Sequence, residues 1–209
     1  MRIHLLTHVL TLAALVGSGL ETENVSAAEP LRLASVFTDN AVLQRGQAVP
    51  VWGKGEPGQT VVVAFAGQEK STMVDKNGRW MTRLDALTAS AKGQTLTAKA
   101  GGEGVAISNV LIGEVWVCSG QSNMAFGLGG SVNGKAAIEA AGDDQLRLFN
   151  ARAQATDELQ ESIGGSWAVD SSQSAGSFSA VGYYFGKALR KKLGVPIGLI
   201  KSAVGGTVA

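Results

Sequence analysis

The pattern of apolar residues changes near Asn109, and this change constrains the fold more than any other feature of the sequence. Before it, short segments such as Arg79–Leu84 and Gln94–Ala100 alternate polar and apolar residues, which is typical of strands with one buried face. After it, Val110–Cys118 is almost continuously apolar, as expected for a strand buried on both faces of a parallel sheet. We therefore expect an all-β part followed by an α/β part.

The first part, residues 29–108, is predicted to form a small β-sandwich. Val49–Gly53 and Thr60–Ala66 are short apolar, β-branched runs bounded by turn residues, which is the signature of strands. Asn77-Gly78 favours a tight hairpin turn before the strand at Arg79–Leu84. Several short strands with regular turn signals are typical of a sandwich.

The second part, residues 109–209, is predicted to be α/β, because a helix lies between two apolar strands. The helix is expected at Ser179–Leu193, followed by a buried strand at Val195–Ile200. Gly194 and Pro196 end the helix. Its buried stripe is predicted from apolar residues at helical spacing, namely Val181, Tyr184, Phe185, Ala188, Leu189 and Leu193.

Residues 1–28 are predicted to be a cleaved secretory signal peptide. Arg2 supplies a positive charge, Ile3–Val16 is mostly Leu, Ala and Val, and Val25–Ala28 offers small-residue cleavage sites. An uncleaved membrane anchor and a buried core helix are the alternatives, but a spanning helix needs about 20 apolar residues. We therefore expect a secreted or periplasmic protein that has no membrane partner after cleavage.

The net charge and the small numbers of cysteines and histidines limit the kinds of function that the sequence allows. The net charge of +1 gives no reason to expect nucleic acid as a partner. Cys118 is the single cysteine, so no intramolecular disulfide can form, and an exported protein of this kind is more typical of bacteria. The two histidines, His4 and His8, both lie in the predicted leader. We therefore expect no metal site and no cofactor.

The polar segment Ser119–Asn123 directly follows the apolar strand that ends at Cys118. In parallel α/β sheets, ligands bind at the carboxyl ends of the strands. A serine there has the surroundings of an acyl-transfer nucleophile, with its own N–H available to an oxyanion. A polar loop in which Ser or Asn caps the next helix has the same composition. The residues alone leave both interpretations open.

Four stretches, in order, resemble the sialate O-acetylesterases and related carbohydrate esterases of the SGNH-hydrolase type. They are Phe37–Arg45 with Val49–Gly53, Gly113–Met124, Phe178–Phe185 and Gly198–Thr207. The resemblance covers about Leu31 to Thr207. It implies an incomplete, flavodoxin-like three-layer α/β sandwich, preceded by a small all-β sandwich.

The resemblance also assigns roles to individual residues. It implies that Ser122 is the nucleophile. Gly206 is the candidate for a second oxyanion donor, and an ordinary turn glycine is the alternative. Gln121 and Asn123 are expected to orient the loop or donate side-chain hydrogen bonds, with a helix cap as an equal alternative for Asn123. Cys118 is the alternative nucleophile, although its position suits a buried thiol better.

A serine hydrolase also needs a base, and in this family the base is a histidine near the C-terminal end of the domain. The sequence reaches Ala209 without such a histidine, so we expect a C-terminally truncated fragment that is inactive by itself. Lys201 is the one lysine to consider as a substitute base. A solvated strand-end charge is its plainer interpretation.

The sequence also supports expectations for Glu114 and for the four tryptophans. Glu114 is expected to face solvent or a turn and to take no part in catalysis. The four tryptophans are expected to pack rather than to serve as sugar platforms, with Trp116 the best candidate for either role; they are Trp52, Trp80, Trp116 and Trp167.

The predicted function is hydrolysis of O-acetyl esters on carbohydrates, with sialic acids as the expected sugars. The reaction proceeds through an acetyl-enzyme on serine. The alternative is a secreted carbohydrate-binding or structural protein that has lost the catalytic triad.

Overall fold

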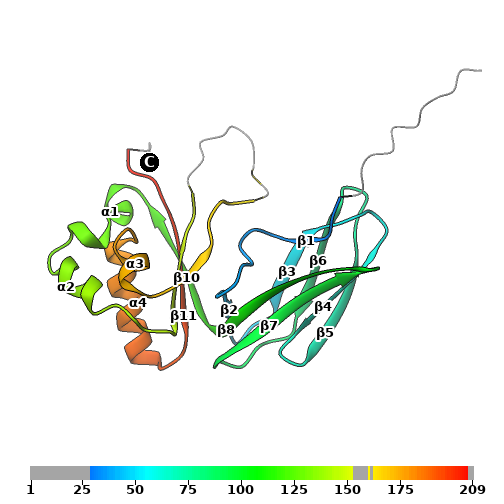
Figure 1. The fold of residues 1–209 in the computed structure, drawn as a ribbon, viewed down its shortest axis with the longest axis horizontal. Coiled ribbons are helices and arrows are strands. Elements are labelled where there is room, and N and C mark those ends of the chain that lie inside the picture. The colour runs from blue at the N-terminus through cyan, green and yellow to red at the C-terminus, as the bar shows by residue number, and fades with distance from the viewer. Residues whose placement is uncertain (1–28, 153–159, 161, 207–209) are drawn as a thin grey trace, which may run out of the picture.

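The computed structural model describes residues 29–152, 160 and 162–206, which form two packed parts (Figure 1). The predicted signal peptide, residues 1–28, lies outside the described residues. Within the described residues, no helix combines the length and the apolar character needed to cross a membrane.

The first part is a sandwich of two sheets, and its strands alternate as the sequence predicts. One sheet has the order β1-β3-β6, and the facing strands have the order β8-β7-β4-β5. In β6, Trp80 and Leu84 are buried, and in β7 the buried residues are Leu96, Ala98 and Ala100. The strands are β1 (Arg32–Leu33), β3 (Val49–Lys54), β4 (Thr60–Phe65), β5 (Gln68–Met73), β6 (Arg79–Leu84) and β7 (Ser90–Ala100).

The turn at Asn77-Gly78 differs from the predicted hairpin. The strand before it, β5, pairs with β4, whereas the strand after it, β6, pairs with β3. The turn therefore carries the chain from one sheet to the other. The amide of Gly78 donates to the carbonyl of Asp75 at 3.0 Å, so Lys76 and Asn77 are its central residues. A tight turn forms here, but Asn77-Gly78 is not its central pair, and the flanking strands do not pair with each other.

A single strand, β8 (Glu103–Gly120), runs through both parts of the molecule. Its beginning pairs with β7, its middle with β2 (Val42–Gln44), and its end with β11 (Ile197–Ala203). Asn109 has a left-handed φ of 54°, and the register with β7 shifts beside it. The change in apolar pattern near Asn109 thus coincides with an irregularity in β8. The predicted division at 108/109 stays a prediction, since one strand continues across it.

The second part is α/β. Strands β8, β11 and β9 (Leu146–Asn150) run parallel, and β10 (Trp167–Val169) pairs antiparallel with β9. The helices lie on one face of these strands, and the sandwich lies toward the other (Figure 1). The helical segments are α1 (Ser122–Ala125), η1 (Leu128–Gly130), α2 (Gly134–Glu139), α3 (Ser172–Ala175) and α4 (Ala180–Leu193).

Two apolar cores hold this arrangement together. Phe149 and Trp167 project from the α/β sheet into the core of the sandwich, and the indole of Trp167 donates to the carbonyl of Val36 at 2.9 Å. On the other face, Leu199 and Tyr183 belong to a second core between the sheet and the helices. The described residues therefore contain one helical layer, as expected of an incomplete three-layer fold.

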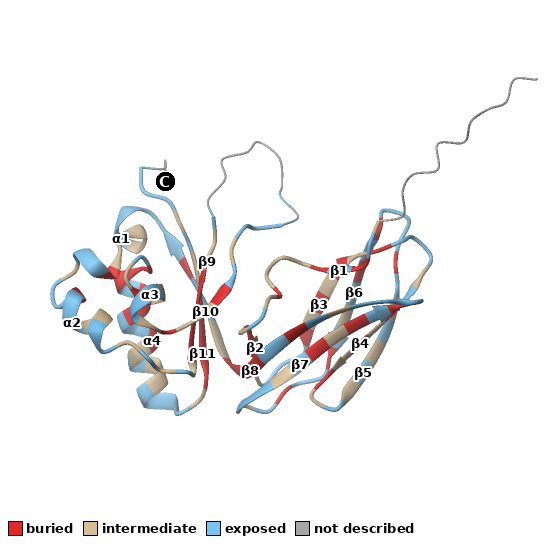
Figure 2. Cartoon of the chain, viewed as in Figure 1, coloured by how far each residue is buried: buried red, intermediate tan, exposed pale blue. Residues whose placement is uncertain are grey.

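Helix α4 begins and ends where the sequence predicts, but its buried face is different. Ser179 caps it, accepting from the amide of Gly182 at 3.1 Å, and Gly194 ends it with a φ of 67°. The buried residues are Ala180, Gly182, Tyr183 and Gly186, whereas Val181, Tyr184, Phe185 and Leu193 of the predicted stripe are exposed (Figure 2).

Two glycines explain why most of the predicted stripe of α4 is not buried, although Leu189 packs against the core between the helices and the sheet. A Cβ on Gly182 would lie 2.9 Å from the Cys118 sulfur, and one on Gly186 would lie 2.5 Å from Leu199. The helix therefore approaches the sheet along its glycines. Counting apolar side chains cannot detect such a contact, because glycine contributes no side chain to the count.

Candidate active site

Ser122 lies where the structure turns from the end of β8 into α1. Strand β8 ends at Gly120, and Ser122 is the first residue of α1. Gly120 has a φ of 147°, and a Cβ there would lie 3.2 Å from Met124. This backbone conformation favours glycine, so Gly120 permits the sharp turn that exposes Ser122 at the carboxyl edge of the sheet.

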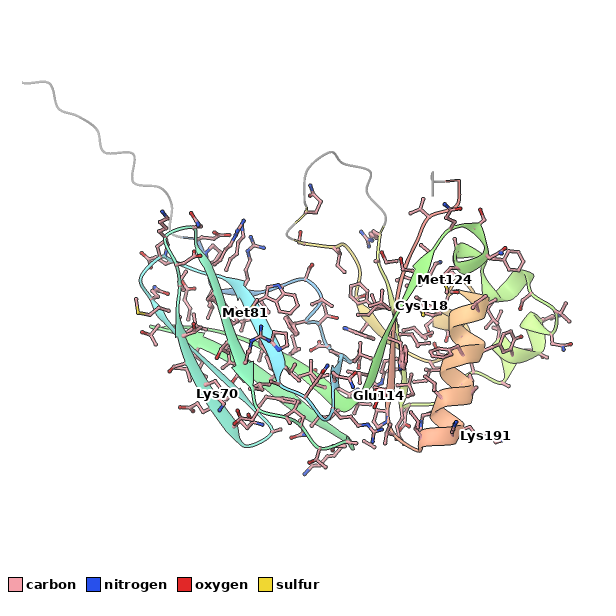
Figure 3. All side chains as sticks on the ribbon, turned by 180° about the vertical axis from the view of Figure 1, so that it is seen from behind. Lys70, Met81, Glu114, Cys118, Met124 and Lys191 are labelled. Atoms are coloured by element: carbon pink, nitrogen blue, oxygen red, sulfur yellow. The ribbon has the colours of Figure 1, made fainter. Side chains whose placement is uncertain are left out.

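Helix α1 is tied to the beginning of α4. The Ser179 hydroxyl donates to the sulfur of Met124 at 3.2 Å, and the amide of Ala180 donates to the carbonyl of Phe126 at 2.9 Å. Figure 3 shows Met124 beside the end of β8. These contacts hold a four-residue helix, which is too short to be stable by itself, in a defined place.

A second loop reaches Ser122 from β11. The pairing of β11 with β8 continues to Ala203 and Gly120, and the amide of Val204 donates to the carbonyl of Gly120 at 3.3 Å. A Cβ on Gly205 would lie 3.4 Å from the Ser122 Oγ. The loop after β11 therefore passes directly beside the hydroxyl, and the absence of a side chain at Gly205 leaves that side open.

An open pocket of about 390 Å³ borders the serine. Ser122 itself is exposed. Apolar side chains of Met124 and Val181 form part of the wall, and the remaining lining residues are Gly120, Gln121, Ser122 and Asn123. A hydroxyl at the edge of such a pocket is accessible to a small ester.

The other residues predicted for the site lie close by in the chain. Gln121 precedes α1 as its N-cap, without a capping hydrogen bond from its side chain, and Asn123 is the second residue of the helix. Asn123 is therefore not the helix cap that was one of its two interpretations. Gly206 is exposed and has a φ of 80°. Their roles as donors stay predictions.

The structure identifies Gly205 as a residue that the sequence analysis missed. Its contact with Ser122 is closer than anything found for Gly206, which has open space around its Cβ position. The available signal was the Gly205-Gly206 pair after an apolar strand. That pattern marks a close backbone approach without saying which glycine makes it.

Cys118 is the buried thiol that the sequence favours. Its exposed fraction is 4%, and it packs under α4 beside Gly182. Burial raises the pKa of the thiol above its ordinary value, which disfavours the reactive thiolate. The position and the protonation state both argue against Cys118 as the nucleophile.

Lys201 forms its hydrogen bond with a backbone carbonyl and not with the Ser122 hydroxyl. Its Nζ donates to the carbonyl of Ser177 at 3.2 Å. No described residue forms a hydrogen bond with the Ser122 hydroxyl, and the described residues contain no histidine. A base for Ser122 is therefore absent from the part of the chain that the structure describes.

Glu114 is partly exposed and faces the bend that follows β2, as the sequence predicts, and there it forms specific contacts. Its carboxylate accepts from Arg45 Nε at 2.7 Å and from Gln44 Nε2 at 3.1 Å. These two hydrogen bonds, the one from Arg45 first, hold the pKa of Glu114 below its ordinary value. Glu114 thus fastens the end of β2 to β8, at the junction of the two parts and away from the pocket (Figure 3).

The tryptophans divide into three packing residues and one exposed residue. Trp80 and Trp167 are buried, and Trp52 packs edge-to-face against Phe37 at a centroid distance of 4.8 Å. Trp116 is 43% exposed and packs edge-to-face on Phe185 at 5.2 Å. Of the four, Trp116 is the one that presents a large surface to solvent.

Comparison with known proteins shows which esterases this arrangement is similar to. Residues 112–209, which contain Ser122 and both loops around it, match the family described as carbohydrate esterase, sialic acid-specific acetylesterase. The match covers a little less than half of the chain. The matched region begins inside β8 and includes all the elements that form the pocket.

Individual relatives agree with this assignment. The chain is 32% identical over 201 residues to the mouse sialate O-acetylesterase and 33% identical over 201 residues to the human one, in each case over 87% of this chain. It superimposes on the crystal structure of a carbohydrate acetylesterase from Xanthomonas citri with a TM-score of 0.81, 38% sequence identity and 85% of this chain covered.

The chain spans only part of these proteins. It covers 37% of the mouse enzyme, 38% of the human enzyme and 41% of the X. citri structure. The superposition covers 85% of this chain. It therefore shows an SGNH-type esterase fold for the matched residues, together with the sheet that precedes it.

Proposed function

We propose that this chain carries the nucleophile half of an esterase that removes O-acetyl groups from carbohydrates, with sialic acids as the substrate sugars. The observation that carries the proposal is the position of Ser122. It is an exposed hydroxyl at the carboxyl end of a parallel strand, beside an open pocket. Ligands bind at this edge in α/β sheets, and the family match includes all of these elements.

The proposed chemistry is acyl transfer through a covalent intermediate. The Ser122 Oγ attacks the acetyl carbonyl carbon while a base takes the hydroxyl proton, and the sugar hydroxyl leaves with that proton. Water then attacks the acetyl-enzyme and releases acetate. The backbone N–H of Ser122 and an amide of the Gly205-Gly206 loop are the proposed oxyanion donors, and Gln121 and Asn123 shape the loop.

The base is the part of this mechanism that the described residues do not supply. The histidines of the sequence are His4 and His8, and Lys201 donates to Ser177 instead. We expect the 209-residue chain to show little or no ester hydrolysis, because a serine hydroxyl without a base is a poor nucleophile.

The test uses a chimera in which residues 29–206 replace the matching part of the X. citri carbohydrate acetylesterase. We expect the chimera to release acetate from an O-acetylated sialic acid and from a chromogenic acetyl ester, and Ser122→Ala to lower the rate at least about 1000-fold. Ser119→Ala is the matched control and should keep most of the activity. Turnover that survives Ser122→Ala would show that another residue is the nucleophile.

The same experiment separates the enzyme from the non-catalytic alternative. That alternative is favoured by the absence of a base among the described residues. A chimera that folds and binds acetylated sugar but releases no acetate would support it. Ser122-dependent turnover by the 209-residue chain itself would instead show that a base is already present.

We also propose that residues 1–28 direct export and are removed after Ala27 or Ala28, so that the protein acts outside the cytoplasm. The order of positive charge, apolar stretch and small-residue site supports this. Mass spectrometry of protein collected from the medium or periplasm tests it, and a mature chain that still begins at Met1 would contradict it.

A further inference from the structure

Ser179 is a fully buried polar residue to which the proposed chemistry gives no role. Its exposed fraction is 0%. As the N-cap of α4, its hydroxyl oxygen accepts a hydrogen bond from the amide of Gly182 at 3.1 Å. A serine hydroxyl also carries one proton, which capping does not use. Because buried polar groups are hydrogen-bonded, the acceptor of that proton indicates what else Ser179 does.

The acceptor is the sulfur of Met124, which lies 3.2 Å from the Ser179 oxygen. Met124 belongs to α1, 55 residues earlier in the chain, and it borders the pocket beside Ser122. A Cβ on Gly120 would lie 3.2 Å from the Cβ of Met124. The methionine is therefore held between the end of β8 and the beginning of α4.

Helix α1 is a single turn, so a shift of Met124 moves Ser122 with it. The amide of Phe126 donates to the carbonyl of Ser122 at 2.9 Å, which closes the turn. None of the four residues of α1 is buried, and a helix of this length is unstable by itself. The place of Ser122 therefore depends on contacts with neighbouring elements, among them the hydrogen bond from Ser179 to Met124.

We propose that Ser179 is a positioning residue for Ser122 and acts through the sulfur of Met124. The inference rests on the proposed function, because positioning concerns a nucleophile that reacts. The Ser179 hydroxyl holds Met124, Met124 holds the turn of α1, and the turn aims the Ser122 hydroxyl beside the Gly205-Gly206 loop. A displacement of about 1 Å can cost about 100-fold in rate, so a buried residue that does not touch the substrate can govern kcat.

A role for Ser179 as helix cap alone is the alternative, and two substitutions separate the roles. Ser179→Ala removes the hydroxyl but keeps the backbone contacts between the two helices, which are the hydrogen bond from Ala180 to Phe126 at 2.9 Å and the bridge between Gly127 and residue 179. Met124→Leu removes the sulfur acceptor and keeps the cap of α4. Positioning requires both substitutions to have the same effect on Ser122.

The first measurement is amide hydrogen exchange in the 209-residue chain, which needs no catalysis. The amide of Phe126 reports the position of α1, since it donates to the carbonyl of Ser122. We expect this amide to exchange at least about fivefold faster in Ser179→Ala and in Met124→Leu than in the unchanged chain.

The second measurement is hydrolysis of the chromogenic acetyl ester by the chimera. We expect Ser179→Ala and Met124→Leu each to lower kcat at least about tenfold, with KM changed by no more than about twofold. Because the two residues act through one hydrogen bond, the double variant should lose no more than about twofold beyond the weaker single variant.

Ser171→Ala is the matched control, because Ser171 caps α3 in the same way. Its hydroxyl accepts from the amide of Ser174 at 3.3 Å. Its loss should lower the melting temperature, as the loss of the Ser179 cap does, but it should leave both kcat and the exchange of the Phe126 amide unchanged. The comparison separates lost positioning from lost stability.

The outcomes are distinct. A kcat that Ser179→Ala leaves unchanged, unchanged exchange at Phe126, or losses that multiply in the double variant would each overturn the proposal. If Ser179→Ala does not fold, Met124→Leu decides the same question, since it keeps the cap. If the chimera shows no Ser122-dependent turnover, the proposed function fails, and exchange in the 209-residue chain still decides whether Ser179 holds α1 in place.

Discussion

The two halves of β8 are both rich in apolar residues, yet they lie in opposite surroundings. In the first half, Val110, Leu111 and Ile112 are buried between the sandwich sheets and their neighbours. In the second half, Trp116 and Val117 are exposed, although the sequence predicts one strand buried on both faces from Val110 to Cys118. The difference teaches that an apolar run specifies a strand, whereas burial depends on which elements lie beside it.

The first prediction sharpens this comparison with a matched pair of truncations, Val110→Ala and Val117→Ala. Val110 is fully buried, so removing its methyl groups should cost about 2 kcal/mol of unfolding free energy. The same change at exposed Val117 should cost less than about 0.5 kcal/mol. Urea unfolding of both variants measures the difference. Equal losses would mean that the second half of β8 is covered in solution.

A smaller effect is expected at Glu114, where the two halves of β8 meet. The Glu114→Gln variant loses the ion pair with Arg45, and we expect a loss of about 1 kcal/mol at neutral pH.

The pH dependence distinguishes this ion pair from simple packing. Because the pKa of Glu114 is lowered in the folded protein, its contribution is present above the ordinary value of 4.5 and is lost as the pH falls through the lowered value. The stability difference between Glu114→Gln and the unchanged protein should therefore shrink as the pH falls below 4.5 and through the lowered pKa of Glu114. A difference that stays unchanged as the pH is lowered through this range would point to packing instead.

Local patterns predicted the elements of this fold well. Period-two alternation identified β6 and β7, and Gly194 with Pro196 placed the end of α4 after Leu193. These features depend on residues that are close in the sequence, so their chemistry can be recognised without tertiary structure.

The sequence missed contacts between distant residues. The orientation of α4 depends on Gly182 meeting Cys118 and on Gly186 meeting Leu199, and the partner of Glu114, Arg45, lies 69 residues earlier in the chain. Within the candidate site, the resemblance to the esterases implied that Ser122 is the nucleophile. The position of Gly205 beside the Ser122 hydroxyl became visible only from the pairing of β11 with β8 in the structure.

The most direct test of the central claim is to trap the acetyl-enzyme. The chimera is mixed with excess acetyl ester, quenched in acid within the first turnovers and digested, and its peptides are examined by mass spectrometry. We expect one acetyl group on the peptide that contains Ser122, placed on that residue by fragmentation, and none in the Ser122→Ala variant. An acetyl group on Ser119 or Cys118, or turnover with no acetylated peptide in either protein, would contradict the assignment of Ser122 as the nucleophile.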